Sequence, residues 1–375
     1  MIYFDSTATT KPTKEILELY NKISLEYWYN SSSAYTMGIK SNNLLQKSIE
    51  VVKEVLKLKD HNVIYTSGAT EANNLAIHGI CNNYINQNKR VITTKIEHPS
   101  VFNVFKSLET LGFDVVYLDI DSNGIINLNQ LKESLTKETV LVSIMWVNNI
   151  IGSIQPINEV INILKEYPRC KLHVDAVQGL GKIKNNFDFN QVDLFTMSSH
   201  KLEGIKGSGA LIYNNKINLT SHIQGANQQL GIKPGTVDLA SAVTTSKTIQ
   251  NVYKNLDNNY NYVLELNKYL RNKLNELNIT INSPVKNVSP YIVNISIKEH
   301  NAETIMHHLE QKEIYVAVGS ACNSKIKKPE KTVLAVTNDE QRATTSIRIS
   351  LSKYISKNDL DTLVKELKNF ISSRS

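Results

Sequence analysis

Short apolar runs rich in β-branched residues alternate with helical patterns between about Lys57 and Asn215 of this 375-residue chain. Seven runs predict strands, at residues 62–67, 89–97, 113–121, 139–149, 171–178, 194–199 and 209–214. Several are almost continuously apolar, which is typical of strands that are buried on both faces. Because helical patterns separate them, they predict an α/β fold with a mainly parallel seven-stranded sheet.

The pattern changes after about Ser246. Residues 250–277 are rich in lysine and asparagine and predict one long helix that bridges two domains. Strand-like runs at 291–298, 314–319 and 346–352 then alternate with helical patterns at 301–311 and 356–370, the last beginning with a capping-box-like Ser356 and Asp359. We expect a large domain over residues 16–250 and a smaller α/β domain formed by residues 251–375 together with 1–15.

The composition and charge argue against a nucleic-acid-binding protein and against a membrane protein. Lysine and arginine together number 42 against 35 acidic residues, and the net charge of +7 is spread along the chain. Because basic and aromatic residues do not gather in one stretch, we expect no direct binding of nucleic acid. The apolar run at residues 140–147 is far shorter than the ~20 residues that a membrane span needs, so no membrane partner is expected.

The amino-terminal sequence and the cysteines indicate a reducing compartment. Residues 1–15 lack the basic region and apolar run of a signal peptide. Cys81, Cys170 and Cys322 are odd in number and widely separated, which argues against a disulfide framework and against a zinc site. We therefore expect a cytoplasmic protein without a bound metal.

Polar side chains follow the predicted strands, at the edge where an open parallel sheet binds ligands. The turn at Gly68 leads into a helix whose first N–H groups suit a phosphate. Four more strands end in imidazole, amide, carboxylate, hydroxyl and amine groups: His98, Asn148, Asn149, Asp175, Gln178, Ser198, His200 and Lys201. Taken singly, each of these residues has an ordinary structural role, such as a helix cap or a surface charge.

Together, these groups match what pyridoxal phosphate requires of a protein. A lysine binds the cofactor covalently, and a carboxylate keeps the pyridine nitrogen protonated so that the ring can accept electrons. An imidazole can stack on the ring, and the start of a helix can hold the phosphate. The sequence therefore predicts an enzyme that uses this cofactor.

Eight motifs occur in order along nearly the whole chain: FDSTATT from residue 4, TSGATEANN from 66, EHPSV from 97, SIMWVNNIIG from 143, HVDAVQ from 173, SSHKLEGIKGSGAL from 198, GSAC from 319 and SIRIS from 346. In order and spacing they resemble the cysteine desulfurases of the NifS/IscS type, in the class V aminotransferase group. The resemblance implies the PLP-dependent transferase fold type I, a homodimer and the substrate L-cysteine.

The resemblance also implies how the cofactor is held. Lys201 would bind it covalently, Asp175 would pair with the pyridine nitrogen, and His98 would stack on the ring and donate a proton. Asn149 and Gln178 would form hydrogen bonds near the phenolic oxygen. The phosphate would be held by a set that includes one residue from the other subunit: Ala69, Thr70, Ser198, His200 and Thr236 of the partner subunit.

For the substrate, the resemblance implies that Arg348 clamps the carboxylate and that Asn30 assists it. An arginine in a strand is a credible bidentate receptor in a chain with so few arginines. Cys322 would be the nucleophile that takes the sulfur as a persulfide. Its thiolate would be favoured by three nearby lysines, at residues 325, 327 and 328.

The implied reaction converts L-cysteine to L-alanine and passes sulfur from Cys322 to an acceptor protein. A transfer-RNA thiolation enzyme, thiamin synthesis and an iron–sulfur scaffold all fit as acceptors. Two alternatives remain open. One is a pyridoxal-phosphate-dependent aminotransferase or selenocysteine or other β-lyase that does not need Cys322, and the other is a degenerate paralogue that acts as a binding scaffold.

The chain departs from the family pattern at several positions. Ile150 stands where the family usually has an acidic residue, and Trp146 stands where a histidine is common. The segment from Gln224 to Thr236 also differs from the usual glycine-rich sequence. These departures concern substrate preference and the dimer contacts at the cofactor, and they leave the predicted catalytic residues in place.

Overall fold

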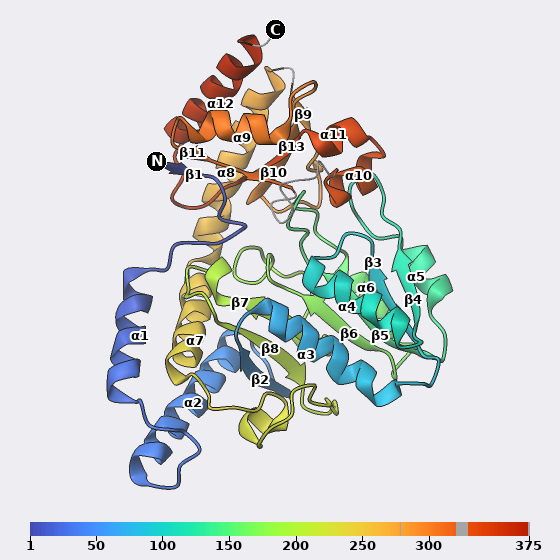
Figure 1. Cartoon of the computed structure of the whole chain (residues 1–375), viewed down its shortest axis with the longest axis vertical. Helices are drawn as coiled ribbons and strands as arrows, with labels where there is room; N and C mark the ends of the chain where they lie inside the picture. The colour runs from blue at the N-terminus through green and yellow to red at the C-terminus, as the bar shows by residue number, and fades with distance from the viewer. Residues whose placement is uncertain (278, 320–328, 374–375) are drawn as a thin grey trace.

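The computed structural model describes residues 1–277, 279–319 and 329–373, and it contains a large and a small β-sheet with helices packed on both (Figure 1). Both termini lie beside the small sheet. The α-helices are α1 (Lys14–Glu26), α2 (Thr36–Val55), α3 (Ala69–Cys81), α4 (Pro99–Thr110), α5 (Leu128–Ser134), α6 (Ile157–Leu164), α7 (Leu239–Lys254), α8 (Leu256–Asn275), α9 (Ala302–Glu310), α10 (Lys331–Thr337), α11 (Glu340–Thr344) and α12 (Lys357–Ser372).

The large sheet has the strand order β2-β8-β7-β6-β5-β3-β4. Its strands are β2 (His61–Thr66), β3 (Arg90–Thr94), β4 (Asp114–Leu118), β5 (Thr139–Met145), β6 (Lys171–Asp175), β7 (Leu194–Ser198) and β8 (Gly209–Asn214). All seven predicted strands are confirmed. β8 runs antiparallel to both of its neighbours and the remaining pairs are parallel, so the prediction of a mainly parallel sheet is also confirmed.

Helices cover both faces of this sheet. Because successive side chains of a strand point to opposite faces, the neighbours Val63 and Ile64 of β2 enter different cores. Helices α3 and α4 pack on the face that carries Ile64, whereas α2, α6 and α7 pack on the face that carries Val63. Burial on both faces explains why these strands are apolar throughout.

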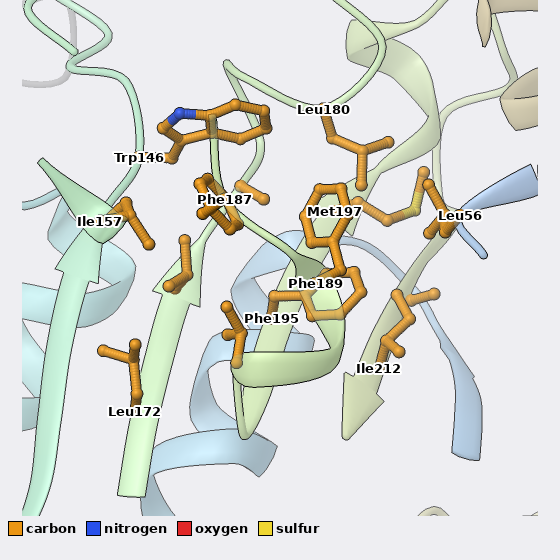
Figure 2. Close-up of a cluster of buried hydrophobic side chains, with 14 of the residues drawn as sticks. Leu56, Trp146, Ile157, Leu172, Leu180, Phe187, Phe189, Phe195, Met197 and Ile212 are labelled. Carbon is orange, nitrogen blue, oxygen red and sulfur yellow. The ribbon is translucent and has the colours of Figure 1, made fainter. Parts of the chain in front are cut away.

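An aromatic cluster lies in the core that contains Val63 (Figure 2). Trp146 directly follows β5, is fully buried and meets the ring of Phe187 edge to face, with 5.0 Å between ring centroids. Gly179 lies against the indole, and a Cβ there would come within 2.3 Å of it. Trp146, one of the departures from the family pattern, is therefore a core residue.

The small sheet has the order β12-β13-β10-β9, with a two-stranded parallel pair of β1 and β11 beside it. The strands are β1 (Ile2–Tyr3), β9 (Thr280–Ile281), β10 (Ile292–Ser296), β11 (Ile314–Tyr315), β12 (Ala317–Val318) and β13 (Ser346–Ser350). A separate buried cluster joins Phe4 to side chains of α8, α9 and α12. We propose the division into residues 16–250 and residues 1–15 with 251–375, which this separate core supports.

The helical stretch predicted over residues 250–277 is two helices rather than one. Asn255 has φ −112° and ψ 11°, outside the helical region, and it ends α7 and precedes α8. The capping box of α12 is confirmed, because Ser356 N donates to Asp359 and Asp359 N donates to Ser356 Oγ. Within the described residues, no helix combines the length and apolar character that a membrane crossing needs.

Candidate active site

The amino-terminal segment Asp5–Thr10 links the small sheet to the carboxyl edge of the large one. Asp5 forms a bridge to Ser350 at the end of β13, and the Thr10 N–H donates to the His200 carbonyl oxygen at 2.8 Å. The His200 imidazole lies 3.1 Å from Thr9 Oγ1, and burial together with nearby lysines lowers its pKa to about 4. His200 is therefore neutral at neutral pH.

Lys201 lies in a short 3₁₀ helix, η3 (Ser199–Lys201), directly after β7. Its Nζ donates to the carbonyl oxygens of Thr7 and Ala8, at 2.8 and 2.5 Å. Burial, and then the positive charge of Arg348, lowers the pKa of Lys201 to about 8. A substantial fraction of this amine is therefore neutral near physiological pH, as a nucleophilic lysine requires.

Asp175 is the last residue of β6, and its carboxylate is held from two sides. Oδ1 accepts from the Val177 N–H at 3.1 Å, and Oδ2 accepts from Asn73 Nδ2 at 3.0 Å. Asn73 is fully buried in α3, where its Oδ1 accepts from Thr196 Oγ1 and its Nδ2 also donates to Ser100 Oγ. This network orients the carboxylate at the edge of the sheet.

His98 caps α4, and its hydrogen bonds define its tautomer. The Ser100 N–H donates to His98 Nδ1 at 3.1 Å, so the proton of the neutral imidazole lies on Nε2. Burial lowers the pKa of His98, against the opposing effect of Asp175. His98 is therefore a neutral imidazole with an N–H available to a ligand.

The first N–H groups of α3 have no side-chain cap, which suits the binding of an anion. Ala69 and Thr70 open the helix after Gly68, which has φ +148° and provides no side-chain cap for the first N–H groups. A Cβ on Gly68 would lie 3.9 Å from Ser198 Oγ, so the hydroxyl lies beside the helix start. Gly209 of β8 packs so closely that a Cβ there would lie 2.8 Å from Gly68 Cα.

Arg348 lies in the middle of β13 and is almost completely buried. Its Nη2 donates to Asp5 Oδ1 at 2.8 Å and its Nη1 donates to the Asn149 carbonyl oxygen at 3.0 Å. Its Nε has no partner among the described residues. Part of the guanidinium is thus fixed by the protein, and a buried N–H remains for an anionic ligand.

Gln178 is also buried and held at both ends of its carboxamide. Nε2 donates to the Thr7 carbonyl oxygen at 3.1 Å, and Oε1 accepts from Lys182 Nζ at 2.7 Å. Thr7 therefore connects Gln178 to Lys201, because one carbonyl oxygen accepts from both side chains.

Two predicted site residues, Asn30 and Thr236, form no hydrogen bond with this cluster within the described part of one chain. Asn30 is exposed in the connection between α1 and α2, and its Oδ1 accepts from the Ser32 N–H. That connection lies at the opposite end of the molecule from β13 (Figure 1), so Asn30 does not reach Arg348 of its own chain. Thr236 is exposed after η4 (Gln228–Gly231), and Cys322 lies outside the described residues.

Two residues of the site, Asn73 and Glu97, are not evident from the sequence. Asn73 lies in the motif TSGATEANN, but one sequence does not show which side chain of this motif faces Asp175. Glu97 directly precedes His98 and is buried, with Oε1 accepting from the Met145 N–H and from Thr94 Oγ1. Burial raises the pKa of Glu97 to about 8, so this carboxyl group is mostly protonated at neutral pH.

The arrangement fits pyridoxal phosphate. The uncapped start of α3 with the Ser198 hydroxyl suits the phosphate, and the oriented carboxylate of Asp175 suits a protonated pyridine nitrogen. The Lys201 amine has a lowered pKa and lies at the same sheet edge. Among the described residues, no group of three or more histidine, cysteine, aspartate or glutamate side chains is placed to hold a metal ion.

Comparison with known proteins gives a consistent result. The model of the family Aminotransferase class-V matches residues 2–363. The "NifS/IcsS protein homolog" of Lactobacillus delbrueckii subsp. bulgaricus is 37% identical over 359 residues, covering 94% of this chain and 92% of that protein. "Cysteine desulfurase IscS" of Dictyoglomus turgidum is 34% identical over 372 residues, covering 99% and 94%.

Solved structures agree with these matches. A structure titled "NIFS-LIKE PROTEIN" superposes with a TM-score of 0.92 at 30% identity and covers 99% of both chains. Another, titled "SspA in complex with cysteine", superposes with a TM-score of 0.83 at 28% identity, covering 95% of this chain and 100% of that one.

Proposed function

Because the chain belongs to the class-V aminotransferase family, we propose that it is a pyridoxal-phosphate-dependent cysteine desulfurase. The observation that carries this proposal is the meeting of Lys201 and Arg348, from two sheets, at the segment Asp5–Thr10, with Asp175 near enough to Lys201 to act on its pKa. The relatives named cysteine desulfurase and the related structure solved with cysteine support L-cysteine as the substrate.

Pyridoxal phosphate, when bound, supplies a sink for the electrons released at the α-carbon of the amino acid. In this proposal, Ala69, Thr70, Ser198 and His200 hold its phosphate, and Asn149 and Gln178 lie near its phenolic oxygen. Lys201 binds the cofactor and later removes the α-proton of the substrate. The buried guanidinium of Arg348 binds the substrate carboxylate. His98 acts as a proton donor in its protonated form, which is the minor form at neutral pH because burial lowers its pKa.

Sulfur transfer falls to Cys322. Its thiolate attacks the sulfur of L-cysteine, so that a sulfur–sulfur bond forms while the carbon–sulfur bond breaks. The electron pair of the broken carbon–sulfur bond stays with the β-carbon, which takes up a proton and becomes the methyl group of L-alanine. The sulfur remains on Cys322 as a persulfide, so the reaction needs no external oxidant or reductant. The persulfide then passes its outer sulfur to an acceptor.

We further propose a homodimer in the cytoplasm with a sulfur-acceptor protein as its partner, either a transfer-RNA thiolation enzyme or an iron–sulfur scaffold. In the dimer, Thr236 of the partner subunit completes the phosphate site. The described cysteines, Cys81 and Cys170, are buried free thiols, which supports a reducing compartment.

The first test measures alanine and sulfide release from L-cysteine in the presence of a thiol reductant. We expect the wild type to form both products and the Cys322→Ala variant to form neither, while both proteins retain the visible absorbance of the bound cofactor. Cys170→Ala, which removes a buried thiol, serves as the control and keeps both activities. Continued turnover by Cys322→Ala would instead indicate a lyase or aminotransferase, and absence of turnover in the cofactor-loaded wild type would indicate a binding scaffold.

A further inference from the structure

Lys182 is a buried lysine beside the site that the proposed mechanism does not use. It lies in the turn that follows β6, and only 8% of it is exposed. Its Nζ donates to Gln178 Oε1 at 2.7 Å, and within the described part of the chain it forms no ion pair with a carboxylate. A buried ammonium without a counter-charge costs the protein free energy.

The charges that act on Lys182 are positive. Burial, and then the charges of Lys201 from η3 and Arg348 from β13, lowers the pKa of Lys182 to about 7. The nearby carboxylates serve other groups, since Asp5 accepts from Arg348 and Asp175 accepts from Asn73. Lys182, Lys201 and Arg348 therefore act on one another as like charges, and an anion bound in this region would relieve that repulsion.

Lys182 also helps to fix the orientation of a cofactor-site residue. The Thr7 carbonyl oxygen can only accept, so the group of Gln178 that faces it is Nε2. Oε1 consequently faces Lys182, whose ammonium can only donate. With both ends of the carboxamide held, Gln178 keeps its second N–H in one fixed direction.

We propose that Lys182 is a positioning residue, which holds Gln178 in place and whose positive charge is balanced by the anionic groups that the site binds. This inference rests on the proposed function, because the anions are the cofactor and the substrate carboxylate. In this proposal, the charge of Lys182 destabilises the cofactor-free protein and stabilises the protein that has bound pyridoxal phosphate.

The test compares Lys182→Met, Lys182→Arg and the control Lys184→Met, in which an exposed lysine paired with Asp257 is lost. For Lys182→Met we expect unchanged or higher thermal stability of the cofactor-free protein, because a buried charge is removed. Its affinity for pyridoxal phosphate, followed by visible absorbance, should fall about tenfold. Lys182→Arg should retain most of the affinity, and Lys184→Met should match the wild type.

The pH dependence adds a second readout. The affinity ratio of wild type to Lys182→Met should decrease as pH rises from about 6 to about 9, because Lys182 then loses the proton that carries its charge. Equal affinities in the two proteins, or parallel losses of affinity and of cofactor-free stability, would overturn the inference while leaving the desulfurase proposal intact. If the wild type binds no pyridoxal phosphate, the proposed function fails and this inference fails with it.

Discussion

At the scale of single residues, burial changes the chemistry of the site more than any other influence. It is the largest cause of the lowered pKa values of Lys201 and His98 and of the raised pKa of Glu97. At neutral pH the site therefore holds a partly neutral amine, a neutral imidazole and a protonated carboxyl group. The neutral amine is the form in which a lysine acts as a nucleophile, and the neutral imidazole keeps an N–H on Nε2 for a hydrogen bond to a ligand.

After burial, the positive charge of Arg348 is the next largest cause of the lowered pKa of Lys201. Replacing Arg348 by methionine removes a positive charge, so we expect the pKa of Lys201 to rise above its value of about 8. Because only the neutral amine attacks the aldehyde of pyridoxal phosphate, the midpoint of cofactor capture should move to higher pH. Stopped-flow absorbance over a pH series measures this midpoint.

The control for this prediction is Arg271→Met, which removes a partly buried guanidinium of α8 that donates to Asn267 and to the Pro284 carbonyl oxygen. Its pH midpoint should equal that of the wild type. If Arg348→Met also leaves the midpoint in place, the electrostatic coupling between Arg348 and Lys201 is absent.

At the scale of elements, the sequence predicted the strands and the chemistry at their ends because buried parallel strands are apolar and the residues after them are not. Asp175, His98 and Lys201 could be recognised for this reason. The contribution of residues 5–10 could not be predicted, because they act through backbone carbonyl oxygens, as Thr7 does toward Lys201. Backbone acceptors leave no residue-type signal in one sequence.

Two further elements show the same limit. The break at Asn255 depends on packing, since α7 contacts α1 and α2 whereas α8 contributes to the core of the small sheet. Local helical propensity extends across Asn255 and conceals the change of partner. The position of Asn30 depends on how α1 and α2 are arranged in space, which the pattern of apolar residues does not define.

The contact between β8 and the start of α3 gives a prediction at this scale. A Cβ on Gly209 would meet the Met197 carbonyl oxygen at 2.6 Å and Gly68 Cα at 2.8 Å, and neither backbone atom can move cheaply. We expect Gly209→Ala to lower stability by roughly 1–3 kcal/mol. We also expect it to weaken the binding of pyridoxal phosphate more than that of pyridoxal, because the phosphate lies at the displaced helix start.

Gly207→Ala is the matched control. Gly207 has φ +73°, but a Cβ there would meet no atom within 4 Å. This variant carries backbone strain of about 1 kcal/mol without pressing on α3, so the preference for pyridoxal phosphate over pyridoxal should be kept. Equal loss of both ligands in Gly209→Ala would show that the close contact does not position the phosphate site.

At the scale of the whole molecule, the site depends on parts that lie far apart in the chain. Lys201 comes from the large sheet, Arg348 from the small sheet, and Asp5 joins them through the amino-terminal segment. The proposed phosphate ligand Thr236 and the residue Asn30 are exposed and form no hydrogen bond with this cluster among the described residues. We therefore propose that a second copy of the chain supplies Thr236 and Asn30 to this site.

Exposed apolar side chains beside a surface hollow support such a dimer. A hollow of about 460 Å³ is lined by the α1–α2 connection at Ser31 and Ser32 and by η4 at Leu230. Trp28 and Leu230, on these same two segments, are 71% and 66% exposed, an unusual degree for large apolar side chains. We expect a dimer in sedimentation velocity, and a shift toward monomer when both residues are replaced by glutamate.

The monomeric variant should also lose most of its affinity for pyridoxal phosphate, because Thr236 of the partner subunit is then missing from the phosphate site. Val285→Glu is the control: Val285 is 85% exposed on the small unit, so it should remain dimeric and active. A wild type that sediments as a monomer and turns over L-cysteine would show that one chain suffices. A monomeric variant with full cofactor affinity would show that dimerisation serves something other than the phosphate site.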